Sequence, residues 1–131
     1  MKANVIQFNL ILAWLWIVLG FVFGFVLGLN FDRTDWLGGY ASWRRRLYRL
    51  SHISFFGLAF INLLFYFTAR GLDLSSLTTR VAAGGFMIGA LTMPACCVVM
   101  AHRPAWRALF LIPVLSLTTS GMLTLWEITK L

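Results

Sequence analysis

The sequence has little charge for its length, and acidic residues are the scarcest. Of 131 residues only four are Asp or Glu, and charged residues of both signs make up 11%, against about 25% in soluble domains. Hydrophobic residues make up 60% of the chain, which is more than one small domain can shield from water. These facts exclude a water-soluble fold and indicate a single domain over residues 1–131, solvated by lipid.

Groups that carry out catalysis are also scarce. All four acids lie in predicted loops or at the end of an apolar run: Asp32, Asp35, Asp73 and Glu127. No pair of carboxylates therefore predicts general acid–base chemistry. The first apolar run has no acid, unlike that of the small multidrug transporters, and Ser116 and Ser120 have no histidine in their own run. We predict no catalytic residues.

The only two cysteines, Cys96 and Cys97, are adjacent. A disulfide between neighbours on a helix would be badly strained, and buried thiols usually behave as small hydrophobic groups. Two histidines and two adjacent thiols also lack the spacing of a tetrahedral metal site. We therefore predict neither a disulfide nor a bound metal ion.

What the sequence does contain is four long apolar runs. Each is close to the roughly 20 residues that a helix needs to cross a bilayer, and they cover residues 5–29, 47–67, 81–101 and 108–126. The first run has 25 residues, too many for the apolar part of a signal peptide, which has about 7–15, so we interpret it as a retained span. The sequence predicts an all-α integral membrane protein, an antiparallel bundle of four transmembrane helices.

The segments between the runs contain residues that start and stop helices. Ser42 is placed to cap the second helix, and Asp73, Ser75 and Ser76 are candidate caps for the third. Pro104 disfavours helix at the preceding residue. The last two spans are therefore predicted to form an antiparallel hairpin.

The net charge of +7 lies almost entirely between the runs. One side of the predicted bundle has seven basic residues, Arg33, Arg44, Arg45, Arg46, Arg49, Arg103 and Arg107; the other has four, Lys2, Arg70, Arg80 and Lys130. The positive-inside rule places loops 30–46 and 102–107 in the cytoplasm and both termini outside. Anionic headgroups are then the expected partners of this charge, rather than nucleic acid.

Small and polar residues follow one face of each run, where helices in lipid pack together. The packing residues are predicted to be Gly20, Gly24 and Gly28 in the first run, Asn62 in the second, and Gly85 and Gly89 in the third. In the fourth run the face consists of Pro113, Ser116, Ser120, Thr124 and Glu127. We expect Glu127 to form an ion pair with Arg70 or Arg80.

Pro94 interrupts the third run. Proline has no backbone N–H, so it leaves the carbonyl of Ala90 without its usual helical partner. The sequence predicts a kink there.

His52 is the one ionisable residue that clearly enters a run. It follows Arg45 and Arg49 on a polar face, and His102 ends the next run on the same side of the membrane. Imidazole is a good ligand for haem iron, and arginines suit haem propionates. A haem b bound by His52, with His102 as second ligand, is therefore one hypothesis; a hydrogen-bonded interhelical histidine and a proton or ion relay are the others.

The block from Trp43 to Ile53, WRRRLYRLSHI, resembles one found in small uncharacterised four-span bacterial membrane proteins. The likeness covers about the first two spans and implies their fold and a bacterial cytoplasmic membrane, with no activity attached.

Three functions remain open from the sequence. The first is a non-catalytic accessory subunit, without a cofactor, that binds other membrane subunits and lipid in a homo- or hetero-oligomer. The second is a haem-b electron carrier that uses His52. The third is a small oligomeric channel or transporter.

Overall fold

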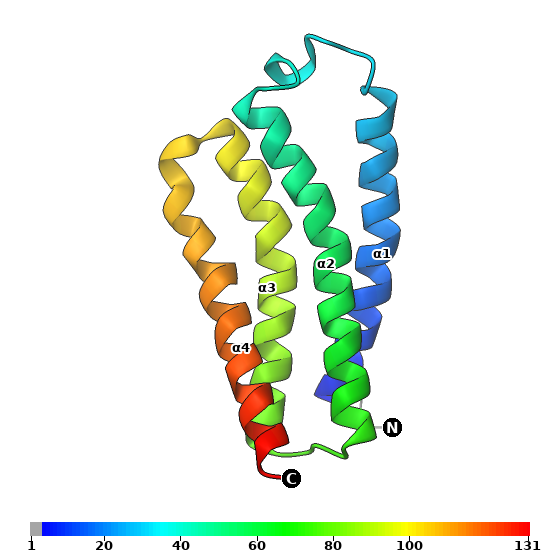
Figure 1. Ribbon diagram of the computed structural model, residues 1–131, viewed down its shortest axis with the longest axis vertical. Coiled ribbons are helices and arrows are strands. Elements are labelled where there is room, and N and C mark those ends of the chain that lie inside the picture. The colour runs from blue at the N-terminus through cyan, green and yellow to red at the C-terminus, as the bar shows by residue number, and fades with distance from the viewer. Residues whose placement is uncertain (1–3) are drawn as a thin grey trace.

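The computed structural model describes residues 4–131 and consists almost entirely of helices. Its four long helices are α1 (Val5–Leu29), α2 (Trp43–Gly71), α3 (Leu77–His102) and α4 (Leu111–Thr129), and two short 3₁₀ helices are η1 (Trp36–Gly38) and η2 (Pro104–Phe110). Successive long helices run in opposite directions (Figure 1). All four helical segments are long and apolar enough to cross a membrane, so the predicted all-α, four-span fold is confirmed.

Hydroxyl and amide side chains start the first three long helices. The Ser42 Oγ accepts a hydrogen bond from the backbone N–H of Arg45 at 3.2 Å, as predicted. Among the three candidates before α3, the cap is Ser76, which accepts from the N–H of Thr79 at 3.0 Å. Because caps determine where a helix begins and the apolar run determines only its membrane-embedded part, α2 and α3 begin before the predicted spans.

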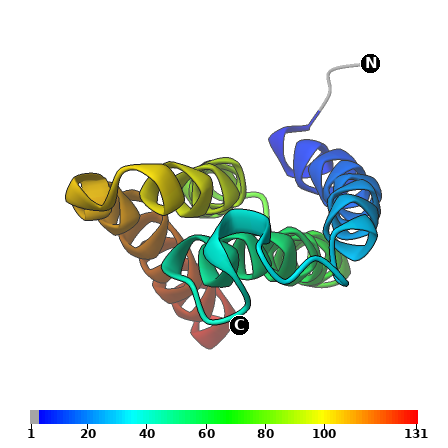
Figure 2. The same ribbon diagram turned by 90° about the horizontal axis from the view of Figure 1, so that it is seen from above.

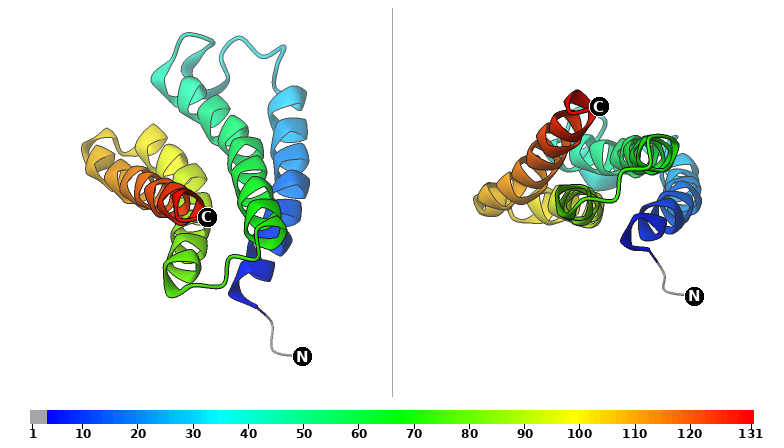
Figure 3. Two further views of the ribbon diagram at one scale, coloured as in Figure 1. Left: turned by 60° about the horizontal axis from the view of Figure 1, so that its bottom comes forward. Right: turned by 90° about the horizontal axis from the view of Figure 1, so that it is seen from below.

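The helices form a row in chain order. α2 packs against α1 and α3, α3 packs against α4, and α1 makes a smaller contact with α3. Seen from above, α1 and α4 lie at opposite sides of the molecule (Figure 2), and the view from below shows the same separation (Figure 3). The bundle is therefore open, with an edge helix at each end of the row.

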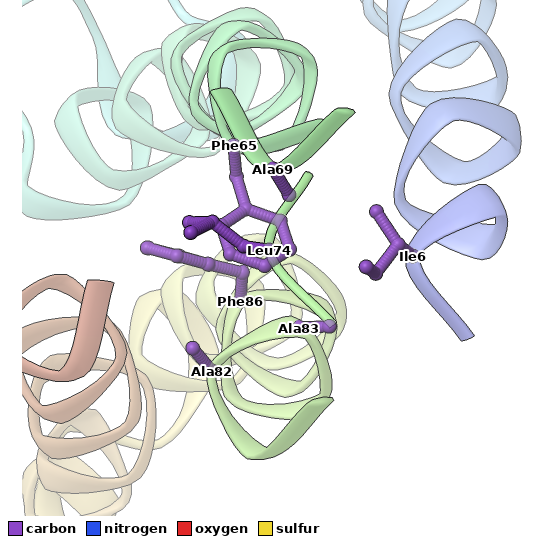
Figure 4. Packing of buried hydrophobic residues seen from close by; sticks show 7 residues of the cluster. All are labelled: Ile6, Phe65, Ala69, Leu74, Ala82, Ala83 and Phe86. Atoms are coloured by element: carbon purple, nitrogen blue, oxygen red, sulfur yellow. The ribbon is translucent and has the colours of Figure 1, made fainter. Parts of the chain in front are cut away.

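The apolar core lies mainly among α1, α2 and α3. Its largest cluster is close to the loop between α2 and α3 and contains Ile6, Phe65, Ala69, Leu74, Ala82, Ala83 and Phe86 (Figure 4). The rings of Phe65 and Phe86 pack with centroids 5.1 Å apart. A second cluster around Trp16 and Ala90 fills the middle of the row. The buried core residues thus come from α1, α2, α3 and the α2–α3 loop, and α4 adds only partly buried side chains such as Leu117 and Leu123.

The packing face of α4 is the one that the sequence predicts. Only three residues of the α4 helix are buried, Pro113, Ser120 and Glu127, and all three belong to the predicted face. The Ser116 hydroxyl donates a hydrogen bond of 2.6 Å to the carbonyl of Gly85. α3 and α4 therefore form the predicted antiparallel hairpin, which turns between His102 and Pro104.

The expected partner of Glu127 is wrong. Its carboxylate pairs with Lys130 at 2.9 Å, and this is the ion pair found among residues 4–131. Lys130 lies three residues further along and so comes from the same side of the same helix. Arg70 and Arg80 remain exposed at the ends of neighbouring helices.

The chain places its loops at two ends of the bundle. The α2–α3 loop and the C-terminus lie at one end, and loop 30–42 and η2 lie at the other (Figure 1). Six of the seven basic residues counted for one side lie within or next to these two segments, and Arg49 is less than two turns into α2. Lys2, counted for the opposite side, lies outside the described residues.

Candidate functional site

Two asparagines form the most deeply buried polar contact. Asn9 of α1 and Asn62 of α2 are both completely buried. The Asn9 Nδ2 donates to the Asn62 Oδ1 at 2.8 Å and to the carbonyl of Ala83 in α3 at 3.1 Å. The Asn62 Nδ2 donates to the carbonyl of Leu58 at 2.8 Å. The pair therefore joins three helices, and cross-helix bonds of this kind contribute about 0.6–2 kcal/mol each in membranes.

The carbonyl that Pro94 leaves free has a partner on another helix. The indole Nε1 of Trp16 in α1 donates to the carbonyl of Ala90 at 2.9 Å. The hydroxyl of Ser51 in α2 donates to the carbonyl of Pro94 itself at 3.2 Å. The helix continues through Pro94. The indole of Trp16 satisfies the carbonyl that proline leaves free, which could not bond to water inside a bilayer, and Ser51 adds a second bond between helices.

Arg45 holds loop 30–42 against the end of α2. Its side chain is buried, with 4% exposed, and its guanidinium lies over the ring of Tyr40, 3.9 Å from the centroid. The guanidinium nitrogens donate to three loop carbonyls, those of Arg33 at 2.7 Å, Phe31 at 3.1 Å and Asn30 at 3.3 Å. Arg45 therefore ties the loop to the start of α2, and it gives the Arg33 carbonyl the hydrogen-bond partner that a buried backbone oxygen needs.

Arg49 is also directed to this loop. Its guanidinium donates to the carbonyl of Tyr40 at 3.3 Å. The two arginines proposed for haem propionates thus both bind backbone oxygens of loop 30–42. Sequence reasoning placed them on the correct face of α2 and could not show that the preceding loop folds back over that face.

His52 packs against α1. Its ring stacks on Phe23 with centroids 6.5 Å apart and meets Phe56 edge to face at 5.5 Å. A Cβ placed on Gly24 would lie 2.5 Å from the His52 Nε2. The small residue thus makes room for the imidazole, and this nitrogen is directed at the α1 backbone.

His102 lies in a different setting, at the exposed end of α3. Its Nε2 shares a hydrogen bond of 2.8 Å with the Tyr48 hydroxyl. The ring of Tyr48 also stacks on Phe23, with centroids 6.1 Å apart. The two imidazoles are therefore connected through Tyr48 and Phe23 and do not contact each other. The haem hypothesis stays a prediction.

The predicted packing glycines differ in their surroundings. A Cβ on Gly20 would lie 2.8 Å from the Phe56 ring of α2, and one on Gly24 would meet His52, whereas one on Gly28 would meet nothing within 4 Å. In α3, a Cβ on Gly85 would collide with the Ser120 hydroxyl of α4, and one on Gly89 would collide with Leu117. Four of these five glycines therefore lie where a second helix approaches closely.

Sequence reasoning missed a cavity that contains two arginines. It has a volume of about 510 Å³, lies among α2, α3 and η2, and includes Arg46 and Arg107 among otherwise apolar side chains such as Leu47, Leu50 and Phe110. The signal was present in the spacing: each arginine precedes an apolar residue on the same helical face, Leu50 four residues later and Phe110 three residues later. Sequence reasoning assigned both arginines to topology and to anionic headgroups in general, and it did not relate them to the apolar residues that follow on the same face.

Residues 4–131 contain no group of three or more His, Cys, Asp or Glu side chains placed to hold a metal ion. Comparison with protein-family models, curated proteins and solved structures gives no match. The fold and the buried polar contacts define a class: a multi-pass α-helical membrane protein whose interior hydrogen bonds join its helices.

Proposed function

We propose that this chain is a non-catalytic accessory subunit of a larger complex in the bacterial cytoplasmic membrane. The observation that carries the proposal is the open row of helices. In the most apolar part of α1 and of the η2–α4 segment, only 17% and 11% of residues are buried, against 33% in α2 and 44% in α3. Two of the four spans thus leave most of their surface to neighbours outside the chain.

The outward side of α3 supports the same proposal. Gly84 is adjacent to Gly85 but faces away from α4, and a Cβ there would meet nothing within 4 Å. Its neighbours on that side, Val81, Ile88 and Leu91, are about half exposed at 55%, 50% and 53%. Small residues with no intramolecular contact are the positions at which another transmembrane helix can approach.

The interior polar groups also support a packing role. Asn9, Asn62, Trp16 and Ser51 each bond to a neighbouring helix. Such bonds fix how the helices sit against each other, which a subunit needs in order to present a constant surface to its partners.

The experiment uses Gly84 on the outward side of α3. The tagged chain is purified in mild detergent, and its size is measured by native mass spectrometry. We expect the wild-type chain to co-purify with other membrane subunits and the Gly84→Leu variant to lose them while keeping its helical circular dichroism. A wild-type chain that runs only as a 14.8 kDa monomer, or a Gly84→Leu variant that keeps the same partners, would count against the proposal.

A further inference from the structure

The cavity around Arg46 and Arg107 is charged at one end and apolar at the other. α2 and α4 both run into the bundle from the end that carries loop 30–42. Arg46 precedes Leu50 along α2, and Arg107 precedes Phe110 along η2. On both walls the guanidinium therefore lies nearer the membrane surface, and the apolar side chain lies deeper.

Both guanidiniums are unpaired. Among residues 4–131, neither the Arg46 nor the Arg107 side chain makes a hydrogen bond or an ion pair, and both residues are exposed. Arg45 and Arg49, by contrast, donate to loop carbonyls. This end of the molecule has seven arginines and two aspartates, a net charge of 7 − 2 = +5. Its potential attracts anions, and the planar fork of arginine matches a phosphate group.

The apolar end of this cavity is followed by a second cavity on the same side of the bundle. A second cavity of about 260 Å³ lies further in, and it is lined by Ile61 of α2 and Gly121 of α4 among others. Ile61 follows Leu50 by 11 residues and Gly121 follows Phe110 by 11. Three helical turns take about 10.8 residues, so each pair shares a face. We call this side, with both cavities, the α2–α4 groove.

The second cavity begins about one leaflet deeper than Leu50 and Phe110, and it continues along the helices to Thr68 of α2 and Ile128 of α4. Eleven residues rise about 16 Å, and half of the hydrocarbon core is about 15 Å thick. Trp43 lies beside Arg46 at the mouth and donates its indole N–H to the carbonyl of Met100 at 3.1 Å. Indoles of this kind usually lie at headgroup level, which places the two guanidiniums at the depth of lipid phosphates.

We propose that the α2–α4 groove is a binding site for an anionic phospholipid. The phosphate lies between Arg46 and Arg107, and an acyl chain extends past Leu50 and Phe110 toward the second cavity. A free phosphate ion would contact only the mouth and leave the apolar walls empty, whereas a zwitterionic lipid would bring a cation to two arginines. An anionic phospholipid fits both the charged mouth and the apolar inner part of the groove.

The test is native mass spectrometry of the full chain in micelles with phosphatidylglycerol or phosphatidylcholine at equal mole fraction. The wild-type chain should retain one phosphatidylglycerol in preference to phosphatidylcholine. The double variant Arg46→Gln/Arg107→Gln should retain phosphatidylglycerol about thirtyfold more weakly. This fold-change corresponds to about 1 kcal/mol of electrostatic attraction lost with each arginine. Retention of phosphatidylcholine should not change.

The matched control removes the same charge from the same end but outside this cavity, in Arg44→Gln/Arg103→Gln. It should retain phosphatidylglycerol as the wild type does; an equal loss would show diffuse surface attraction and overturn the site. Leu50→Trp keeps the charge and narrows the apolar part, so it should also weaken retention. The proposal is overturned if Leu50→Trp or Arg46→Gln/Arg107→Gln binds as the wild type, or if millimolar inorganic phosphate displaces the lipid.

Discussion

Single residues in this protein act mainly by satisfying backbone oxygens. Trp16, Ser51 and Arg45 all donate side-chain hydrogen bonds to backbone carbonyls of other helices or loops, and the carbonyl that Trp16 binds is the one that Pro94 leaves free. Water performs this task at the surface of a soluble protein, but no water is present in the bilayer core. The cost of removing such a donor is therefore the cost of an unpaired carbonyl in hydrocarbon as well as the lost bond.

The bond from Trp16 gives a prediction at this scale. Trp16→Phe keeps an aromatic ring but removes the N–H that the Ala90 carbonyl accepts. We expect the free energy of unfolding, measured by titration with a denaturing detergent, to fall by about 1 kcal/mol. Trp14→Phe, on the exposed side of the same helix, is the control and should change nothing. Equal stability of the two variants would show that the indole bond contributes nothing.

The sequence predicted the free carbonyl of Ala90 but not its partner. Proline chemistry is local, so the missing N–H of Pro94 can be read from the chain alone. The donor comes from 74 residues earlier, and its identity depends on how α1 is rotated against α3. The same limit applies to Arg45, whose place on the polar face was predictable while its three loop carbonyls were not.

At the scale of elements, the α3–α4 hairpin shows how small residues replace the hydrophobic effect in lipid. Ser120 and Leu117 of α4 occupy the space beside Gly85 and Gly89, and the Ser116 hydroxyl bonds to the Gly85 carbonyl. Such close approach increases van der Waals contact, which is the main attraction between helices in a membrane. α4 depends mainly on this seam with α3, and its next largest contact is with the η2 segment that precedes it.

The two adjacent glycines of α3 allow a paired prediction. Gly85→Leu puts a side chain where Ser120 lies, so we expect the free energy of unfolding to fall by about 1–3 kcal/mol, the usual cost of overpacking. Gly84→Leu points away from α4 and should leave this free energy unchanged. Unfolding by denaturing detergent, followed by circular dichroism, measures both. If Gly84→Leu were the more destabilising change, the assigned face of α3 would be wrong.

The pattern of small residues predicted faces better than partners. In α4 the predicted face contains all three buried residues, because spacing alone determines which side chains share a side of a helix. In α1 the same reasoning grouped Gly28 with Gly20 and Gly24, yet only the last two are covered by α2. The extent of a contact depends on the angle at which helices cross, and no local pattern records that angle.

On the scale of the whole molecule, the two ends differ in charge. The end with loop 30–42 and η2 has seven arginines, and the opposite end has Arg70, Arg80 and Lys130 among the described residues. Four antiparallel spans place the α2–α3 loop and the C-terminus together, so a single orientation follows for the entire chain. The positive-inside rule predicts that the arginine-rich end faces the cytoplasm.

Cysteine labelling in intact cells tests this orientation. In a background with Cys96→Ala and Cys97→Ala, we introduce Ser75→Cys in the α2–α3 loop or Thr34→Cys in loop 30–42, both at exposed positions. A membrane-impermeant maleimide should modify Ser75→Cys directly and Thr34→Cys only after the cells are permeabilised. The reverse pattern would place the arginine-rich end outside.

The indole of Trp16 also has a consequence for biogenesis. Ribosomes deliver α1 to the membrane before α3, so the donor for the Ala90 carbonyl is already embedded when the proline-containing span arrives. A truncated chain that begins at α2 would insert α3 with that oxygen facing lipid. Co-expression of α1 as a separate peptide should then restore the stability of such a fragment, since the missing part is a neighbour and not a covalent link.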